Sequence, residues 1–300
     1  MPAAHSFVSR TSYGKYPRPQ VVLICPHDGE GPSFVRYCPQ LVEACSCNRE
    51  TLFKYLNIEQ DVGSAALSHV IASSLQARRG DFRVDVVELR MPRGVVDGNR
   101  TTETAVQPIF SHAEFPDLCA ALRNIHETAV GSVWSVLDQL APGGVFLDVH
   151  SMAPYNPAGD PASPTQAVSK SPTTIPQYVE AYVSPSDCKR PVDIVTMTVS
   201  EVTVADDRLA QALAERFKEH GIEYGFNVPY PTDEHIMTTL YMRRYPGNAL
   251  DVPKDRLVVQ QGREAARQLH ALTIDPEAVN RLAQPIVEAL WQRLQRHGSD

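Results

Sequence analysis

Three side chains of metal-binding type follow two largely apolar segments of the chain. His27 and Glu30 come just after the apolar run Val21–Cys25, and His150 follows the segment 145–149. Two histidines and one glutamate with an open coordination position form the ligand set of a catalytic zinc site. The open position holds a water whose pKa the metal lowers towards about 7. Each piece alone is common by chance, but their combination after two predicted strands indicates a metal site formed by His27, Glu30 and His150.

A polar cluster lies between these segments, at residues 97–100. Asp97, and Asp148 two positions before His150, are acids that could accept from the outer nitrogen of a ligating histidine. Arg100 could hold a carboxylate through its planar guanidinium, and Asn99 could add a hydrogen bond. The alternative is an ordinary Asp-Gly turn followed by a surface arginine.

The elements that must position these residues alternate between strands and helices. Carboxyl ends of strands in such sheets form ligand-binding edges, so we expect an α/β sandwich with a mostly parallel, mixed sheet. Strands are predicted at 20–25, 82–89, 145–151, 192–199, 222–228 and 247–253. Helical periodicity predicts helices within 49–75, interrupted at Gly63, and at 117–140, 207–220 and 276–297. Segments 152–190 and 229–246 carry no clear pattern, and a long irregular segment of this kind is typical of an active-site loop.

The domain organisation follows from the same pattern. Residues 1–19 are polar and lack periodicity, which predicts a loosely attached N-terminal arm. We find no internal repeat and no linker in 20–300, so we expect a single domain there.

Composition excludes several classes of protein. The net charge of -7 argues against nucleic-acid binding, because there is no basic excess to neutralise phosphates. No apolar run approaches the roughly 20 residues that span a bilayer, and the N-terminus lacks the apolar core of a signal peptide. Six cysteines are too few for a disulfide scaffold in 300 residues. We therefore expect a cytoplasmic protein without a membrane partner, of an oligomeric state that the sequence does not indicate.

Three motifs together resemble the N-formylglutamate amidohydrolase family, which is related to the zinc carboxypeptidases. They are P-H-D-G-E at 26–30, R-x-x-x-D-x-N-R at 93–100 and L-D-V-H-S-M at 147–152. Weaker matches occur at 126–133, 227–230 and 249–255, in the order typical of the family. The resemblance implies a three-layer α/β/α sandwich of the phosphorylase/hydrolase-like kind found in zinc carboxypeptidases.

The resemblance also implies roles for individual residues. One Zn²⁺ per chain would be held by His27, Glu30 and His150, while Asn99 and Arg100 would bind the substrate carboxylate or polarise the scissile carbonyl. The general base would be Asp251, where related enzymes usually carry the longer Glu. Glu234, in the irregular segment, is a less favoured base.

The substrate is less well defined than the reaction type. The segment after Asn227-Val-Pro-Tyr230 departs from the family pattern, and we expect Tyr230 and this segment to shape the substrate pocket. Arg243 and Arg244 would suit the side-chain carboxylate of an acidic N-acyl amino acid, although a solvated arginine pair is an equal alternative. The expected reaction is hydrolysis of N-formyl-L-glutamate to formate and glutamate. The alternatives are a zinc peptidase or carboxypeptidase, a deacylase of another N-acyl amino acid, and a non-catalytic binding protein on a hydrolase fold.

Overall fold

The protein is organised around one seven-stranded mixed sheet. The computed structural model describes residues 7–45, 47–80, 82–158, 170–197, 202–230 and 234–295. The strand order is β1-β3-β2-β4-β7-β5-β6. Parallel pairs join β3 to β2, β2 to β4, β4 to β7 and β5 to β6, whereas β1–β3 and β5–β7 are antiparallel. The strands are β1 (Val8–Tyr13), β2 (Val21–Cys25), β3 (Val84–Leu89), β4 (Val145–Met152), β5 (Val192–Val195), β6 (Tyr224–Phe226) and β7 (Gly247–Pro253).

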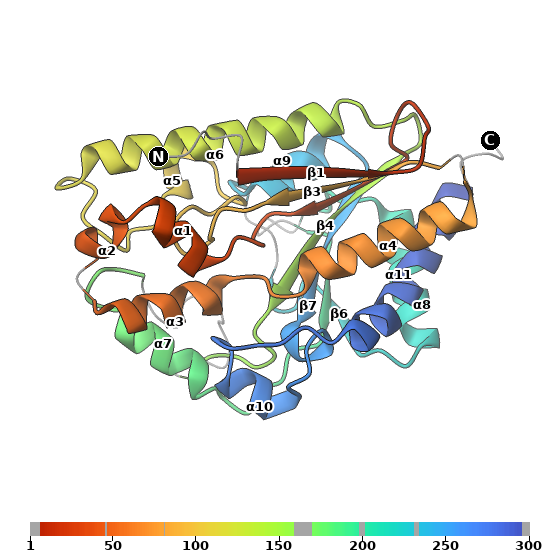
Figure 1. Cartoon of the computed structure of the whole chain (residues 1–300). Helices are drawn as coiled ribbons and strands as arrows, with labels where there is room; N and C mark the ends of the chain where they lie inside the picture. The colour runs from red at the N-terminus through yellow and green to blue at the C-terminus, as the bar shows by residue number, and fades with distance from the viewer. Residues whose placement is uncertain are drawn as a thin grey trace.

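Helices cover both faces of this sheet, as Figure 1 shows. They surround it as α1 (Gly31–Tyr37), α2 (Gln40–Ala44), α3 (Arg49–Glu59), α4 (Ser64–Arg78), α5 (Thr102–Ala105), α6 (Pro116–Leu137), α7 (Ile175–Val183), α8 (Asp207–Glu219), α9 (Met237–Arg244), the 3₁₀ turn η2 (Lys254–Arg256), α10 (Gly262–Arg267) and α11 (Pro276–Gln295). The three-layer α/β/α architecture with a mostly parallel sheet is therefore confirmed.

Two hydrophobic cores hold the layers together, one on each face. Successive side chains of a strand point to opposite faces. Val22 and Ile24 of β2 accordingly pack into the core with α1, α3, α6 and α9. Val21 and Leu23 pack into the other core with α4, α8 and α11. Because both faces are covered, β2 and β4 are buried along their whole length. This burial explains why β2 is a continuous apolar run, whereas β4 combines apolar residues with the buried polar residues Asp148, His150 and Ser151.

The N-terminal segment differs from the arm predicted by its sequence. Val8–Tyr13 forms the edge strand β1, which pairs with β3 along six residues. Backbone pairing holds this strand, and its side chains are at most half-buried, so its sequence lacks the apolar character of the inner strands.

The predicted elements and the observed ones agree closely in the middle of the chain. Gly63, with a φ of +91°, separates α3 from α4 as the glycine pattern predicts. The irregular segments contain two short helices, α7 and α9, that were not predicted. Parts of the predictions for 1–19, 152–190, 192–199, 229–246 and 276–297 lie outside the described residues. No helix within the described part of the chain is both long and apolar enough to cross a membrane.

Candidate metal centre

A buried group of three potential ligands lies at the carboxyl edge of the central strands. His27 follows β2, His150 lies in β4, and Asp61 lies in the short connection between α3 and α4. Oδ2 of Asp61 is 3.1 Å from Nδ1 of His27 and 3.2 Å from Nδ1 of His150. The two Nδ1 atoms are 3.3 Å apart. The backbone amide of Asp61 also donates to the His27 carbonyl at 3.0 Å, which ties the two ligand-bearing loops together.

The outer nitrogen of each histidine faces a carboxylate. Nε2 of His27 is 2.7 Å from Oδ1 of Asp97, and Nε2 of His150 is 3.3 Å from Oδ1 of Asp148. Metal-ligating histidines have the same arrangement, in which the outer N–H donates to a carboxylate. A neutral imidazole carries one ring proton, so an Nε2–H leaves Nδ1 as a lone pair directed at the cluster.

This donor set fits a metal ion. Three acceptor atoms that face one another at 3.1–3.3 Å require a cation between them, either a proton or a metal. In a tetrahedral zinc site with bonds of about 2.0–2.1 Å, the ligand atoms lie about 3.3–3.4 Å apart. The observed separations are close to that value. His27, Asp61 and His150 would hold the metal, and imidazole and carboxylate donors together suit several divalent transition metals, zinc among them.

The charges around the cluster stabilise its ionised acids. Burial alone would raise the pKa of Asp61, but His27, His150 and Arg93 hold that pKa well below its ordinary value. Burial likewise opposes ionisation of Asp97, whose pKa is nevertheless lowered by His27, Arg93 and Arg100. Burial would lower the pKa of His150, but Asp148 and Asp61 raise it well above its ordinary value. The acids therefore stay ionised and favour a cation within the cluster, either the proton of His150 or a metal ion.

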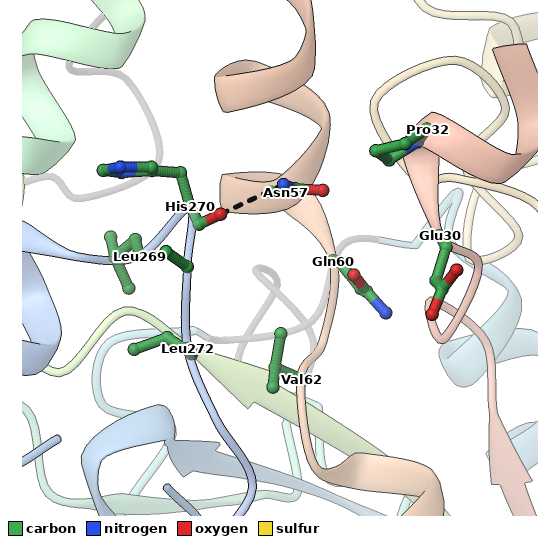
Figure 2. Close-up of a pocket in the computed structure, with 9 residues that line it drawn as sticks. Glu30, Pro32, Asn57, Gln60, Val62, Leu269, His270 and Leu272 are labelled. Atoms are coloured by element: carbon green, nitrogen blue, oxygen red, sulfur yellow. Dashed lines mark hydrogen bonds between the residues drawn. The ribbon is translucent and has the colours of Figure 1, made fainter. Parts of the chain in front are cut away.

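Glu30 lies outside this group of three ligands. It is exposed and occupies the N-cap position of α1, where Ser33 donates to its Oε2 at 2.8 Å. Figure 2 shows its carboxylate and the side chain of Gln60 pointing into the space between them, in a cavity of about 240 Å³. The start of α1 carries Glu30 away from the histidines, and Asp61 takes the third place beside them. This geometry therefore does not support the prediction that Glu30 is a metal ligand, and that prediction remains untested.

Asp97 is delivered to His27 by a close approach of two loops. A Cβ added to Gly98 would lie 2.9 Å from the carbonyl oxygen of Pro26, the residue before His27. Only a glycine allows the 97–100 loop to approach the His27 loop so closely. This packing explains why the loop needs the Asp97-Gly98 sequence.

Asn99 and Arg100 lie next to the cluster. The side chain of Asn99 is held by a hydrogen bond, whereas that of Arg100 is exposed. The Oδ1 of Asn99 accepts from the backbone amide of Thr238 at 2.8 Å, which leaves its Nδ2 group as the part it can offer to a substrate. The side chain of Arg100 is 43% exposed, and its Nε is 3.7 Å from Oδ2 of Asp97. An exposed guanidinium beside the cluster can bind a carboxylate.

Asp251 lies beside the cluster on β7. It is the register partner of His150 on β4 and of Asp193 on β5, and neighbouring strands are about 4.8 Å apart. Burial raises the pKa of Asp251, against the opposing effect of His150. The carboxyl group of Asp193 accepts from the amides of Val228 and Tyr230, at 2.9 and 3.0 Å. Asp193 thereby fixes the segment that carries Tyr230.

The structure does not bring Arg243 and Arg244 to the cluster. Both are exposed at the C-terminal end of α9, whose first residue, Met237, donates to the Asn99 carbonyl at 3.0 Å. The helix runs from there toward the opposite edge of the sheet, where Arg244 pairs with Asp138 at 2.9 Å. Arg243 pairs with Glu234 at 3.5 Å instead.

Two residues of the site were not singled out from the sequence. Asp61 lies in a short Asp-Val-Gly connection between helices, and its position just before the helix-breaking Gly63 is the signal that could have identified it. Arg93 begins the motif at 93–100 and faces three acids, with nitrogens 3.7–3.8 Å from Glu59, Asp61 and Asp97. The sequence assigned it no role, because two of the three acids that it faces, Glu59 and Asp61, lie on a distant segment of the chain.

The fold and this cluster define an α/β protein with a candidate metal centre at the carboxyl edge of its sheet. No protein-family model and no curated protein matches the chain. Solved structures do share its fold. It is similar to an N-formylglutamate amidohydrolase from Ralstonia eutropha JMP134, with 12% identity, a TM-score of 0.55 and coverage of 96% of this chain and 98% of that one. It is also similar to a gene product of Agrobacterium tumefaciens, with 16% identity, a TM-score of 0.57 and coverage of 97% and 96%. At these identities the likeness is one of fold.

Proposed function

We propose that this protein is a zinc-dependent hydrolase that cleaves the amide bond of an N-acyl amino acid, with N-formyl-L-glutamate as the expected substrate. The observation that carries the proposal is the buried group of His27, Asp61 and His150, in which three ligand atoms lie 3.1–3.3 Å apart. The motifs at 26–30, 93–100 and 147–152 and the shared fold with the Ralstonia protein support membership of the same family.

Asp251 is the general base in this proposal. When bound, zinc supplies a Lewis acid and lowers the pKa of water toward neutrality. Asp251 accepts the proton of the attacking water and returns it to the leaving nitrogen. Its pKa, raised by burial, brings the carboxyl group closer to the pH at which it must both accept and donate a proton. Asp251 is the register partner of His150 on the neighbouring strand, which places the base next to a metal ligand in this proposal.

Asn99 and Arg100 bind the substrate in this proposal. The exposed guanidinium of Arg100 binds the α-carboxylate through charge-assisted hydrogen bonds, and the Nδ2 group of Asn99 donates beside it. Tyr230 would help to shape the substrate site in this proposal, and its hydroxyl accepts from Nη1 of the buried Arg190 at 2.9 Å.

A second candidate differs only in the substrate side chain. On α9, Arg243 pairs with Glu234 and Arg244 pairs with Asp138 at the end of α6, so neither arginine is paired with a group of the cluster or offers a site for a second carboxylate there. This placement favours a deacylase of another N-acyl amino acid as the alternative. The two candidates share the metal, the base and the α-carboxylate site.

The test combines metal analysis with a comparison of substrates. Protein purified without chelators is expected to contain about one zinc per chain and to release formate from N-formyl-L-glutamate faster than it hydrolyses N-acetyl amino acids or short peptides. His150→Ala should lose both zinc and activity. His220→Ala is the matched control, because His220, at the C-terminal end of α8, pairs with Glu288 of α11 and is no part of the cluster.

Each outcome separates the candidates. If another N-acyl amino acid is hydrolysed faster than N-formyl-L-glutamate, the second candidate function is the correct one. A zinc-free protein, or a His150→Ala protein with full zinc content and full rate, would refute the metal assignment. Zinc binding without hydrolysis of any of these amides would favour a non-catalytic binding protein.

A further inference from the structure

The two histidines of the cluster are also connected through a second, outer path of buried polar groups. Asp97 faces His27, and the backbone amide of Asn99 donates to the same Asp97 oxygen at 2.9 Å. On the other side, Asp148 faces His150. Thr238, near the start of α9, closes the path between Asn99 and Asp148.

The contacts of Thr238 are short and buried. Its hydroxyl oxygen is 2.5 Å from Oδ2 of Asp148 and 2.7 Å from Oδ1 of Asn99, and the residue is 1% exposed. A hydroxyl has a single proton, so the carboxylate of Asp148 and the amide oxygen of Asn99 share that one proton as acceptors. The other carboxylate oxygen of Asp148, Oδ1, is buried and has no hydrogen-bond partner among the described residues. Oδ1 of Asp148 thus faces Nε2 of His150 as an ion pair at 3.3 Å, and Thr238 is the hydrogen-bond donor that the described residues provide to Oδ2.

The hydroxyl group has a role separate from the docking of α9. The backbone amides of Met237 and Thr238 donate to the carbonyl and Oδ1 of Asn99, at 3.0 and 2.8 Å. These two bonds cap the N-terminus of the helix and do not need the threonine side chain. Removing the hydroxyl alone would leave the helix capped but remove the hydrogen bond to Oδ2 of Asp148.

We infer that Thr238 is a positioning residue, whose hydroxyl orients Asp148 against His150 while it restrains the Asn99 side chain. Orientation of a ligating histidine by its carboxylate partner depends on how that carboxylate is itself held. Thr238 thus joins the metal ligand to the substrate-binding pair through one hydrogen-bonding group. This inference rests on the proposed function for the presence of the metal, but not for the identity of the substrate.

The test is the zinc affinity of three variants, measured by competition with a chromophoric chelator. Thr238→Val keeps the shape of the side chain and removes the hydroxyl, and Thr238→Ser keeps the hydroxyl. Thr238→Val should bind zinc about tenfold more weakly, at the lower end of the range for partners of metal ligands. Thr238→Ser should bind it as the wild type does. Thr238→Ala serves if the valine variant does not fold, and it should also bind zinc more weakly than Thr238→Ser.

A spectroscopic measurement distinguishes positioning from a purely structural role. Cobalt-substituted Thr238→Val should show an altered visible spectrum, because the orientation of His150 changes, and Thr238→Ser should not. A valine variant with lower thermal stability but wild-type zinc affinity and cobalt spectrum would overturn the inference and leave the proposed function intact. A wild-type protein that binds no zinc would overturn both. The expected zinc affinities without hydrolysis of any N-acyl amino acid would refute the proposed function and support the role of Thr238.

Discussion

Replacing Asp61 with Asn removes the charged ligand from the candidate metal centre with little change in shape. The Asp61 oxygen that lies 3.1 and 3.2 Å from the two histidine nitrogens becomes part of a neutral amide. Glu30→Gln is the matched comparison, because it makes the same chemical change at the residue that the sequence motif predicts as the ligand. Glu30 is exposed and accepts from Ser33, so its amide analogue should leave the cluster unchanged.

The expected loss of affinity follows from the number of ligands. Zinc binding to structural sites contributes about 12 kcal/mol, or about 3 kcal/mol for each of four ligands. Loss of one ligand should therefore weaken zinc binding roughly a hundredfold in Asp61→Asn. Glu30→Gln should change it by about twofold at most, as surface substitutions do.

Competition with a chelator of known affinity measures both variants under the same conditions, with thermal unfolding of the metal-free proteins as a check on folding. The reasoning is refuted if Asp61→Asn binds zinc as the wild type does while Glu30→Gln loses it. That result would restore the ligand set His27, Glu30 and His150 and would show that the loop after β2 adopts another conformation when metal binds.

Three further predictions concern catalysis, substrate binding and stability. Asp251→Asn should lower kcat about a thousandfold, as expected for loss of a general base, while the zinc content stays at one per chain. Arg100→Ala should raise KM about tenfold to a hundredfold through lost charge-assisted hydrogen bonds, whereas Arg244→Ala, whose partner is the exposed Asp138, should leave kinetics unchanged. Burial and the neighbouring Asp251 raise the pKa of Asp193 to about 7, above its unfolded value, so the free energy of unfolding should fall as pH rises from about 4 to 7. This fall should amount to about 4 kcal/mol and be shallower in Asp193→Asn, which denaturant unfolding at several pH values would measure; equal slopes in the two proteins would contradict the assignment.

The strands that carry the histidines were predictable because burial on both faces of a sheet produces a direct sequence signal. β2 is continuously apolar and His27 follows it, while β4 begins with three apolar residues and carries Asp148 and His150 further along, toward the ligand-binding edge. His27 and His150, together with their partners Asp97 and Asp148, could therefore be placed near one another from sequence alone. The three-layer fold followed from the same alternation of strands and helices.

The third ligand was not predictable in the same way. Asp61 reaches the cluster from a connection between two helices, and only the packing of α3 and α4 against the sheet decides where that connection lies. Glu30 follows His27 closely in sequence, but the start of α1 turns its side chain toward a different cavity. Proximity in sequence therefore did not predict proximity in space at this loop.

The placement of Arg243 and Arg244 depended on an element that the sequence did not reveal. α9 is a short helix within a segment of polar and aromatic residues without clear periodicity. Its first turn contacts Asn99, and its direction carries the arginines toward the other edge of the sheet. The same helix brings Thr238 to the site, and no motif had singled out that residue.

The most direct test of the candidate metal centre is anomalous diffraction at the zinc edge from crystals of the zinc-loaded protein. We predict one strong anomalous peak per chain within about 2.0–2.2 Å of Nδ1 of His27, Nδ1 of His150 and an oxygen of Asp61. A peak coordinated by Glu30 in place of Asp61, or a peak remote from both histidines, would contradict it.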